Sequence, residues 1–149
     1  MLLLGIDLGT SSVKVSVLDA ATQQSIAAVQ YPDTELDIIS PQPGWAEQSP
    51  DMWWDNVKQA ILKCNTTKLY NPGDITAIGI AYQMHGLVLV DKEQHVLRNS
   101  IIWCDSRAVE IGDHAFEKIG KEKCLYHLLN SPGNFTASKL AWVKENEPA

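Results

Sequence analysis

A carboxylate followed by a glycine and two hydroxyl residues stands near the N-terminus, where Asp7 precedes Gly9, Thr10 and Ser11. Successive N–H groups in such a turn form a concave anion site, and the two hydroxyls add donors. Gly9 lets the backbone approach a ligand closely and adopt angles that other residues avoid. Asp7 would repel a phosphate, but it can hold the Mg²⁺ ion that neutralises one. This spacing fits a phosphate site or a plain hairpin turn equally well.

A second polar group interrupts two apolar segments at Gln83, Met84 and His85. Open α/β sheets usually bind their ligands at such a break between buried strands. The alternative is a hydrogen-bonded core histidine beside a glycine bulge, which is commoner for a lone histidine. Trp103, at the end of another apolar run, can wall a sugar pocket or simply pack. Asp105 is most simply a helix cap, and Arg107 a surface residue or the ion-pair partner of Asp105.

The elements that must position these residues form a mixed α/β pattern. The alternation of polar and apolar residues over Ser12–Val17 predicts a strand with one buried face. Tight turns join it to its neighbours, so the first three strands form an antiparallel meander. Pro50 suits the first position of a helix whose core face is formed by Trp53, Trp54, Val57, Ala60 and Ile61. The predicted strands are Leu2–Asp7, Ser12–Val17, Ser25–Tyr31, Ile75–Ala81, Gly86–Val90 and Ser100–Trp103, and later helices cover Asp105–Ile119, Glu122–Leu129 and Thr136–Glu145.

Composition narrows the class of protein. The 149 residues include 12 Lys+Arg and 18 Asp+Glu, which gives a formal net charge of −6. An acidic chain argues against a large surface for nucleic acid or an anionic membrane, and no apolar run reaches the roughly 18 residues of a spanning helix. The three cysteines are far apart and the four histidines lack ligand spacing, so we expect reduced thiols, no structural metal and a cytoplasmic location.

The segment from Asp7 to Lys14 resembles the opening of the FGGY carbohydrate kinases, members of the superfamily of sugar kinases, actin and heat-shock chaperones. Further segments resemble the same family in the same order: Pro43–Gln48 with Trp53–Trp54, then Gln83–Gly86, then Ile102–Arg107. The phosphate turn identifies only the superfamily, whereas the Gln-Met-His-Gly run points to the branch that phosphorylates D-xylulose.

Two sibling branches differ from this chain at the same run. Gluconate kinases tend to carry serine at the position of Gly86, and glycerol kinases carry an Arg-Glu pair in place of Met84 and His85.

This resemblance implies a ribonuclease-H-like (actin-like ATPase) domain with helices packed on a mixed sheet. It also implies transfer of the γ-phosphoryl group of ATP, with Mg²⁺, to the 5-hydroxyl of D-xylulose in pentose catabolism. Asp7 would help to hold Mg²⁺-ATP, and Gly9, Thr10 and Ser11 would face the phosphates. The sugar-side residues implied are Met84 and His85, with Gln83 and Trp103 beside them.

One departure from the family affects activity. The family's catalytic base is an aspartate in the second half of a longer, two-domain chain, and no position up to Ala149 matches it. We therefore expect residues 1–149 to be the N-terminal part of the first kinase domain, without the second domain and inactive alone. We also expect uncovered apolar surface to favour self-association, for example as a homodimer. The alternatives are a kinase for a sibling sugar such as gluconate, a non-catalytic sugar-binding half-domain, and a chaperone-like or actin-like ATPase.

Overall fold

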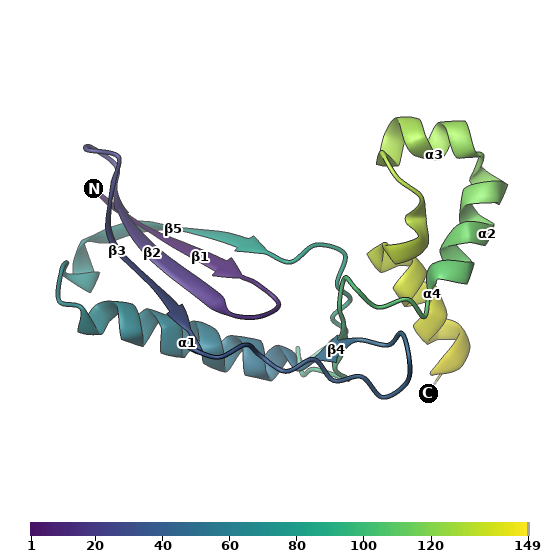
Figure 1. Cartoon of the computed structure of the whole chain (residues 1–149), viewed down its shortest axis with the longest axis horizontal. Helices are drawn as coiled ribbons and strands as arrows, with labels where there is room; N and C mark the ends of the chain where they lie inside the picture. The colour runs from purple at the N-terminus through teal and green to yellow at the C-terminus, as the bar shows by residue number, and fades with distance from the viewer. Residues whose placement is uncertain (149) are drawn as a thin grey trace. The chain divides into compact units, whose positions relative to one another are not determined.

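The computed structural model describes residues 1–148, which form two compact units. The first unit combines Met1–Asp37 with Pro50–Gln83, and the second combines Ile38–Ser49 with residues 84–148. The order of the elements along the chain can be followed by colour in Figure 1.

The first unit is built on a four-stranded sheet in the order β3-β2-β1-β5. Strands β1 (Leu2–Leu8), β2 (Val13–Asp19) and β3 (Gln24–Tyr31) pair antiparallel, which confirms the predicted meander. Strand β5 (Ile75–Tyr82) pairs parallel to β1, after the short 3₁₀ helix η1 (Pro72–Asp74). A parallel neighbour requires a crossover connection, and helix α1 (Pro50–Thr66) provides it.

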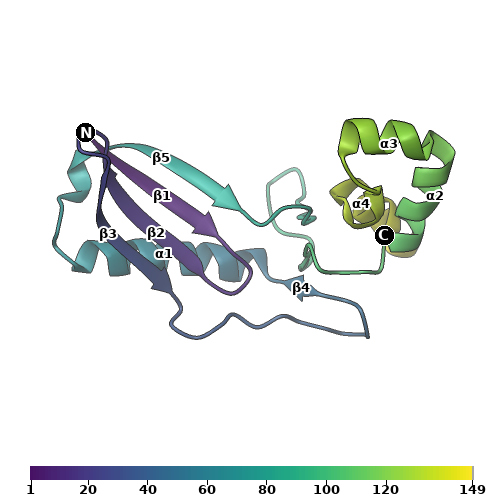
Figure 2. The same ribbon diagram turned by 45° about the horizontal axis from the view of Figure 1, so that its top comes forward.

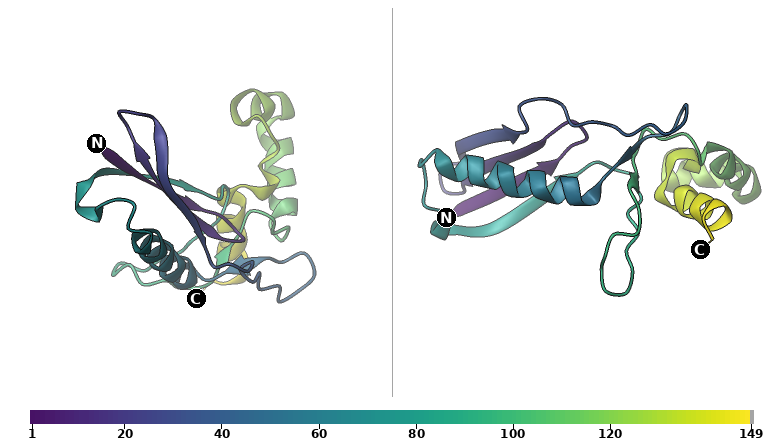
Figure 3. Two further views of the ribbon diagram at one scale, coloured as in Figure 1. Left: turned by 60° about the vertical axis from the view of Figure 1, so that its left-hand side comes forward. Right: turned by 90° about the horizontal axis from the view of Figure 1, so that it is seen from below.

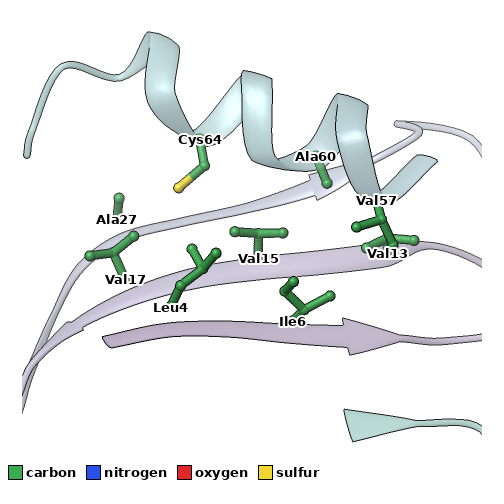
Figure 4. Close-up of a cluster of buried hydrophobic side chains, with 9 residues drawn as sticks. All are labelled: Leu4, Ile6, Val13, Val15, Val17, Ala27, Val57, Ala60 and Cys64. Carbon is green, nitrogen blue, oxygen red and sulfur yellow. The ribbon is translucent and has the colours of Figure 1, made fainter. Parts of the chain in front are cut away.

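Helix α1 lies along one face of this sheet (Figure 2; Figure 3, right). The period-two pattern of β2 directs Val13, Val15 and Val17 toward the helix, while Lys14 and Ser16 stay exposed. Pro50 occupies the first helical position, as predicted. Figure 4 shows the resulting core between helix and strands, which consists of Leu4, Ile6, Val13, Val15, Val17, Ala27, Val57, Ala60 and Cys64.

Two predictions of burial in this unit, one in α1 and one in β5, are wrong. Trp53 is 8% exposed but Trp54 is 61% exposed, because consecutive helical residues are about 100° apart and cannot both face the sheet. The predicted strand Ile75–Ala81 is present within β5, but it was expected to be buried, and Ile78 and Ile80 are each at least 60% exposed. Helix α1 packs on β1, β2 and β3, and β5 is an edge strand of the four-stranded sheet in residues 1–148.

The second unit contains little strand and most of the helix. Strands β4 (Glu47–Gln48) and β6 (Ser100–Ile101) pair antiparallel over two residues. Helices α2 (Val109–Ile119), α3 (Lys121–Leu128) and α4 (Thr136–Asn146) follow, with the 3₁₀ helix η2 (Pro132–Asn134) before α4 (Figure 2). A Cβ atom on Gly112 would lie 2.3 Å from Cα of Gly133, so α2 and η2 pack backbone against backbone.

Two predicted elements of this unit differ from the structure. Gly86–Val90 is not a strand, since Leu87 and Val90 form only isolated bridges, to Ile101 and Val96. Strand β6, which Leu87 contacts, has only two residues and so cannot pair with a longer strand. Just after Val90 the chain reverses direction in a turn, where the Asp91 N–H donates to the His95 carbonyl at 3.0 Å. The helix predicted from Asp105 begins only at Val109, and its N-cap residue makes no side-chain cap.

Asp105 instead belongs to a buried ion network. Its carboxylate accepts hydrogen bonds from the Ala46 N–H at 2.6 Å and from the backbone and side chain of Arg107 at 2.7–3.0 Å. The Arg107 guanidinium also pairs with Glu47 at 2.8 Å and lies 3.8 Å from the Trp45 ring centroid. The ion-pair alternative for Arg107 is therefore confirmed, and Trp45 packs against Arg107 within this unit.

Further charges extend the same network. Arg98 pairs with Glu47 at 2.6 Å and with Glu147 at 2.5 Å. Lys139 is fully buried and its Nζ donates to the Asn134 carbonyl. Burial lowers the pKa of Lys139, while the negative charge of Asp105 acts in the opposite direction.

Candidate functional site

The turn between β1 and β2 is closed by its own backbone. The Gly9 N–H donates to the Ser12 carbonyl at 3.1 Å, and a Cβ atom at position 9 would lie 2.9 Å from that carbonyl oxygen. Glycine is thus required by this close contact within the turn, and not by a positive φ, which Gly9 does not have. From outside the turn, the Leu36 N–H donates to the Ser11 carbonyl at 2.8 Å and fixes its position.

The two hydroxyl residues of the turn differ in exposure and contacts. The Ser11 residue is exposed, and the Thr10 hydroxyl donates to the Gln83 side-chain oxygen at 3.3 Å. The Gln83 N–H in turn donates to the Leu8 carbonyl at 3.0 Å. Gln83, which the resemblance placed beside the sugar, therefore lies against the predicted phosphate turn in the first unit.

Asp7 and Lys14 face each other across β1 and β2. They are directly opposite in register, and their side chains form an ion pair at 3.5 Å with about half of each side chain exposed. Both point to the face opposite α1, because they alternate with the core residues Ile6 and Val15. An exposed carboxylate with a neighbouring ammonium group is a donor set that suits a hydrated Mg²⁺ ion and the phosphate it accompanies.

An open depression of about 890 Å³ begins beside this pair. Its floor is formed by small residues of the sheet, among them Gly5, Ser16, Ala28 and Ala81. Small side chains leave room above the strands, and the charges of Asp7 and Lys14 lie next to the end of β1 that leads into the Gly9 turn. The carboxylate, the turn and the open space are therefore neighbours within one unit.

The predicted sugar residues of the second unit lie on two turns, one with Met84 and His85 and one with Trp103. Met84 is 65% exposed, and His85 is half-buried with a positive φ of 61°. The His85 ring stacks on Phe135, with centroids 4.6 Å apart and 14° between the ring planes. Trp103 follows β6 and is 48% exposed. Met84, His85 and Trp103 thus belong to the second unit, whereas Asp7, the Gly9–Ser11 turn and Gln83 belong to the first.

Sequence reasoning missed two residues that contact this turn. Phe135 supplies the stacked ring, and the Thr136 hydroxyl donates to the Gly86 carbonyl at 3.1 Å. The only sequence signal was their place at the start of a predicted helix, which gives no hint of a contact about 50 residues away along the chain. Only the packing of α4 in the second unit reveals them.

Other classes of site find no support in residues 1–148. No group of three or more His, Cys, Asp or Glu side chains could hold a metal ion there, and no helix in that range is long and apolar enough to cross a membrane. Cys64 and Cys124 are buried free thiols, and Cys104 is an exposed one.

Comparison with known proteins identifies the family. Residues 2–149 match the model of the FGGY family of carbohydrate kinases, N-terminal domain. The xylulose kinase of Escherichia coli (strain K12) is 38% identical over 145 residues, which cover 97% of this chain and 28% of that protein. The xylulose kinase of Bacillus subtilis (strain 168) is 35% identical over 150 residues, which cover 97% of this chain and 28% of that protein.

Solved structures give the same result. A xyloylose kinase from Brucella ovis has a TM-score of 0.87 and 36% identity, covering 99% of this chain and 30% of that one. A gluconate kinase from Lactobacillus acidophilus has a TM-score of 0.80 and 26% identity, and the match covers 99% of this chain and 29% of that one. The mixed α/β, actin-like ATPase fold is therefore confirmed, and the chain spans less than a third of the length of these relatives. The chain belongs to the FGGY family of carbohydrate kinases.

Proposed function

We propose that this chain is the N-terminal part of the first domain of an ATP-dependent xylulose kinase, located in the cytoplasm. The reaction transfers the γ-phosphoryl group of ATP to the 5-hydroxyl of D-xylulose and yields D-xylulose 5-phosphate. The observation that carries this proposal is the 38% identity to a xylulose kinase over 97% of the chain. The Gln-Met-His-Gly run at Gln83–Gly86 supports the same substrate.

The nucleotide side is assigned to the first unit. Asp7 would help to hold Mg²⁺-ATP, since its carboxylate is exposed beside the turn. Gly9, Thr10 and Ser11 would face the phosphates, because the turn is held rigidly while the Ser11 side chain remains exposed. Bound Mg²⁺ would neutralise phosphate charge, and phosphoryl transfer depends mainly on such neutralisation and on positioning.

The sugar side is assigned to Met84, His85, Gln83 and Trp103. Imidazole nitrogens and amide groups hydrogen-bond hydroxyls, and an exposed indole suits the apolar face of a sugar. Neither ring nitrogen of His85 is hydrogen-bonded to any other residue in the range 1–148, so both are available to a ligand. The proton of the sugar hydroxyl would go to the family's catalytic aspartate, which no position in residues 1–149 matches, and we therefore expect no phosphorylation of the sugar by residues 1–149 alone.

Calorimetric titration of D-xylulose into the chain, with D-gluconate as the competing sugar, tests the assignment. We expect selective xylulose binding that His85→Ala abolishes and that His114→Ala, a change at an exposed position on α2, leaves intact. Equal binding of both sugars would reject the xylulose assignment. A coupled assay with Mg²⁺-ATP should show no turnover, and robust phosphorylation by the purified chain would refute its inactivity.

A gluconate kinase is the second candidate, because a solved gluconate kinase shares this fold at 26% identity. Gluconate carries a carboxylate that xylulose lacks, so the same titration separates the two. Tighter binding of gluconate than of xylulose would favour this candidate.

A further inference from the structure

The turn that carries Met84 and His85 is fixed by contacts that reach it from α4. His85 has a φ of 61°, a left-handed conformation that is costly for a residue with a Cβ atom. Such a conformation persists only where the surrounding structure holds it. Phe135, the residue before α4, stacks on the His85 ring at 4.6 Å, and Thr136 donates its hydroxyl to the Gly86 carbonyl at 3.1 Å.

The backbone on the far side of the turn is also fixed. The Leu87 N–H donates to the Ile101 carbonyl at 2.9 Å, and the Ile101 N–H returns a bond of 3.2 Å to the Leu87 carbonyl. Both residues are buried, at 5% and 0% exposure. The main chain is thus held at Gly86 and Leu87, and the orientation of the imidazole within the turn depends on Phe135.

A stacked contact leaves the hydrogen-bonding edge of the imidazole unused. The lone pair and the N–H of a neutral imidazole lie in the ring plane, whereas Phe135 occupies a ring face, with only 14° between the planes. The contact therefore orients both nitrogens without consuming either of them. A ring so held loses less rotational freedom when it binds a hydroxyl than a free side chain would.

We propose that Phe135 is a positioning residue that orients His85 for hydrogen bonds to the sugar hydroxyls, and that Thr136 supports it by holding the turn. This inference rests on the proposed function, in which His85 contacts the sugar. Loss of one ring of an aromatic pair of this kind is expected to weaken sugar binding about three- to tenfold.

The test compares Phe135→Leu, which keeps apolar volume but loses the ring, with Phe135→Tyr, which keeps the ring. Phe116→Leu, at a half-buried position of α2, is the matched control. NMR of the His85 Cε1–Hε1 group reports the stacking, because the ring current of Phe135 displaces this resonance. Calorimetry with D-xylulose reports the function of the contact.

We expect Phe135→Leu to return the His85 resonance toward its free-peptide position and to weaken xylulose binding about three- to tenfold. Phe135→Tyr should restore both readouts, and Phe116→Leu should change neither. Thr136→Val, an exposed change that removes the hydroxyl alone, should weaken binding in the same direction without loss of the fold.

Two results would overturn the inference in distinguishable ways. If xylulose binds to the unmodified chain and to Phe135→Leu equally, while His85→Ala abolishes binding, the sugar site stands and Phe135 has no positioning role. If the unmodified chain binds no xylulose, the sugar site itself is refuted together with the role of Phe135, whatever the NMR signal shows.

Discussion

The buried carboxylate of Asp105 provides a sharp test of what holds the second unit together. Its Oδ1 atom accepts from the N–H and the Nε of Arg107, and its Oδ2 atom accepts from the Ala46 N–H and from the Arg107 side chain. Asp105→Asn preserves the shape of the side chain but replaces one oxygen by an NH₂ group. Either orientation of that amide places a donor against a donor, so no rotation relieves the conflict.

The expected cost follows from this geometry. The Arg107 side chain is 1% exposed; it would lose its ion pair with Asp105 and keep the 2.8 Å pair with Glu47 and the contact with the Trp45 ring. Removing one partner of a buried ion pair typically costs about 3–5 kcal/mol, out of the roughly 5–15 kcal/mol that stabilises a domain. We therefore expect Asp105→Asn to destabilise the second unit by about 3 kcal/mol or more, at neutral pH.

Hydrogen exchange combined with urea denaturation measures this effect in each unit separately. The amide of Ala46, which donates to Asp105 at 2.6 Å, should exchange about a hundredfold faster, while amides of the first-unit core such as Val15 should not change. Asp113→Asn, at an exposed position of α2, is the matched control and should alter stability by less than about 0.5 kcal/mol. A loss below about 1 kcal/mol for Asp105→Asn would refute the reasoning.

Three further changes test other parts of the structure. Gly86→Ser should fold with an unchanged or raised melting temperature, because a Cβ atom at position 86 has room, at 3.7 Å from the Ser100 hydroxyl. That hydroxyl is buried and has no hydrogen-bond partner in residues 1–148, so the new serine could bond to it. A clear drop in the melting temperature would contradict this expectation. We expect concentration-dependent self-association through the exposed edge of β5, and Ile80→Lys should suppress it; sedimentation that shows a monomer of the unmodified chain at all concentrations would count against it. Burial, followed by the influence of Cys64, raises the pKa of Tyr70 from 10.0 to about 12. The folded state therefore holds the Tyr70 proton more tightly than the unfolded state does, and this stabilises the fold fully below pH 10 and is lost between pH 10 and 12. Tyr70→Phe should reduce the loss of stability over this pH range in urea titrations. Identical pH profiles of the variant and the unmodified chain would exclude this contribution of Tyr70.

Much of the first unit could be predicted because short stretches of sequence encode its strands, turns and helix start. The alternation over Val13–Val17, the tight turns and the Pro50 helix start each encode one element within a few neighbouring residues, and the structure confirms all three. The two wrong predictions of burial in this unit concern Trp54 and strand β5. Trp54 lies beside the buried Trp53 on a helix that turns only one face to the sheet, whereas the apolar residues of β5 are exposed because α1 packs on β1, β2 and β3.

The sequence by itself determined the family, the meander and the Asp7–Ser11 turn, because each is written in contiguous residues with few alternatives. Only the tertiary structure decided the role of Asp105, which a local pattern read as a helix cap and which instead accepts from Ala46, 59 residues earlier. It also placed Gln83 against Thr10 and Phe135 against His85. Contacts between residues 50 or more positions apart are set by how elements pack, and no short pattern in a single sequence records that packing.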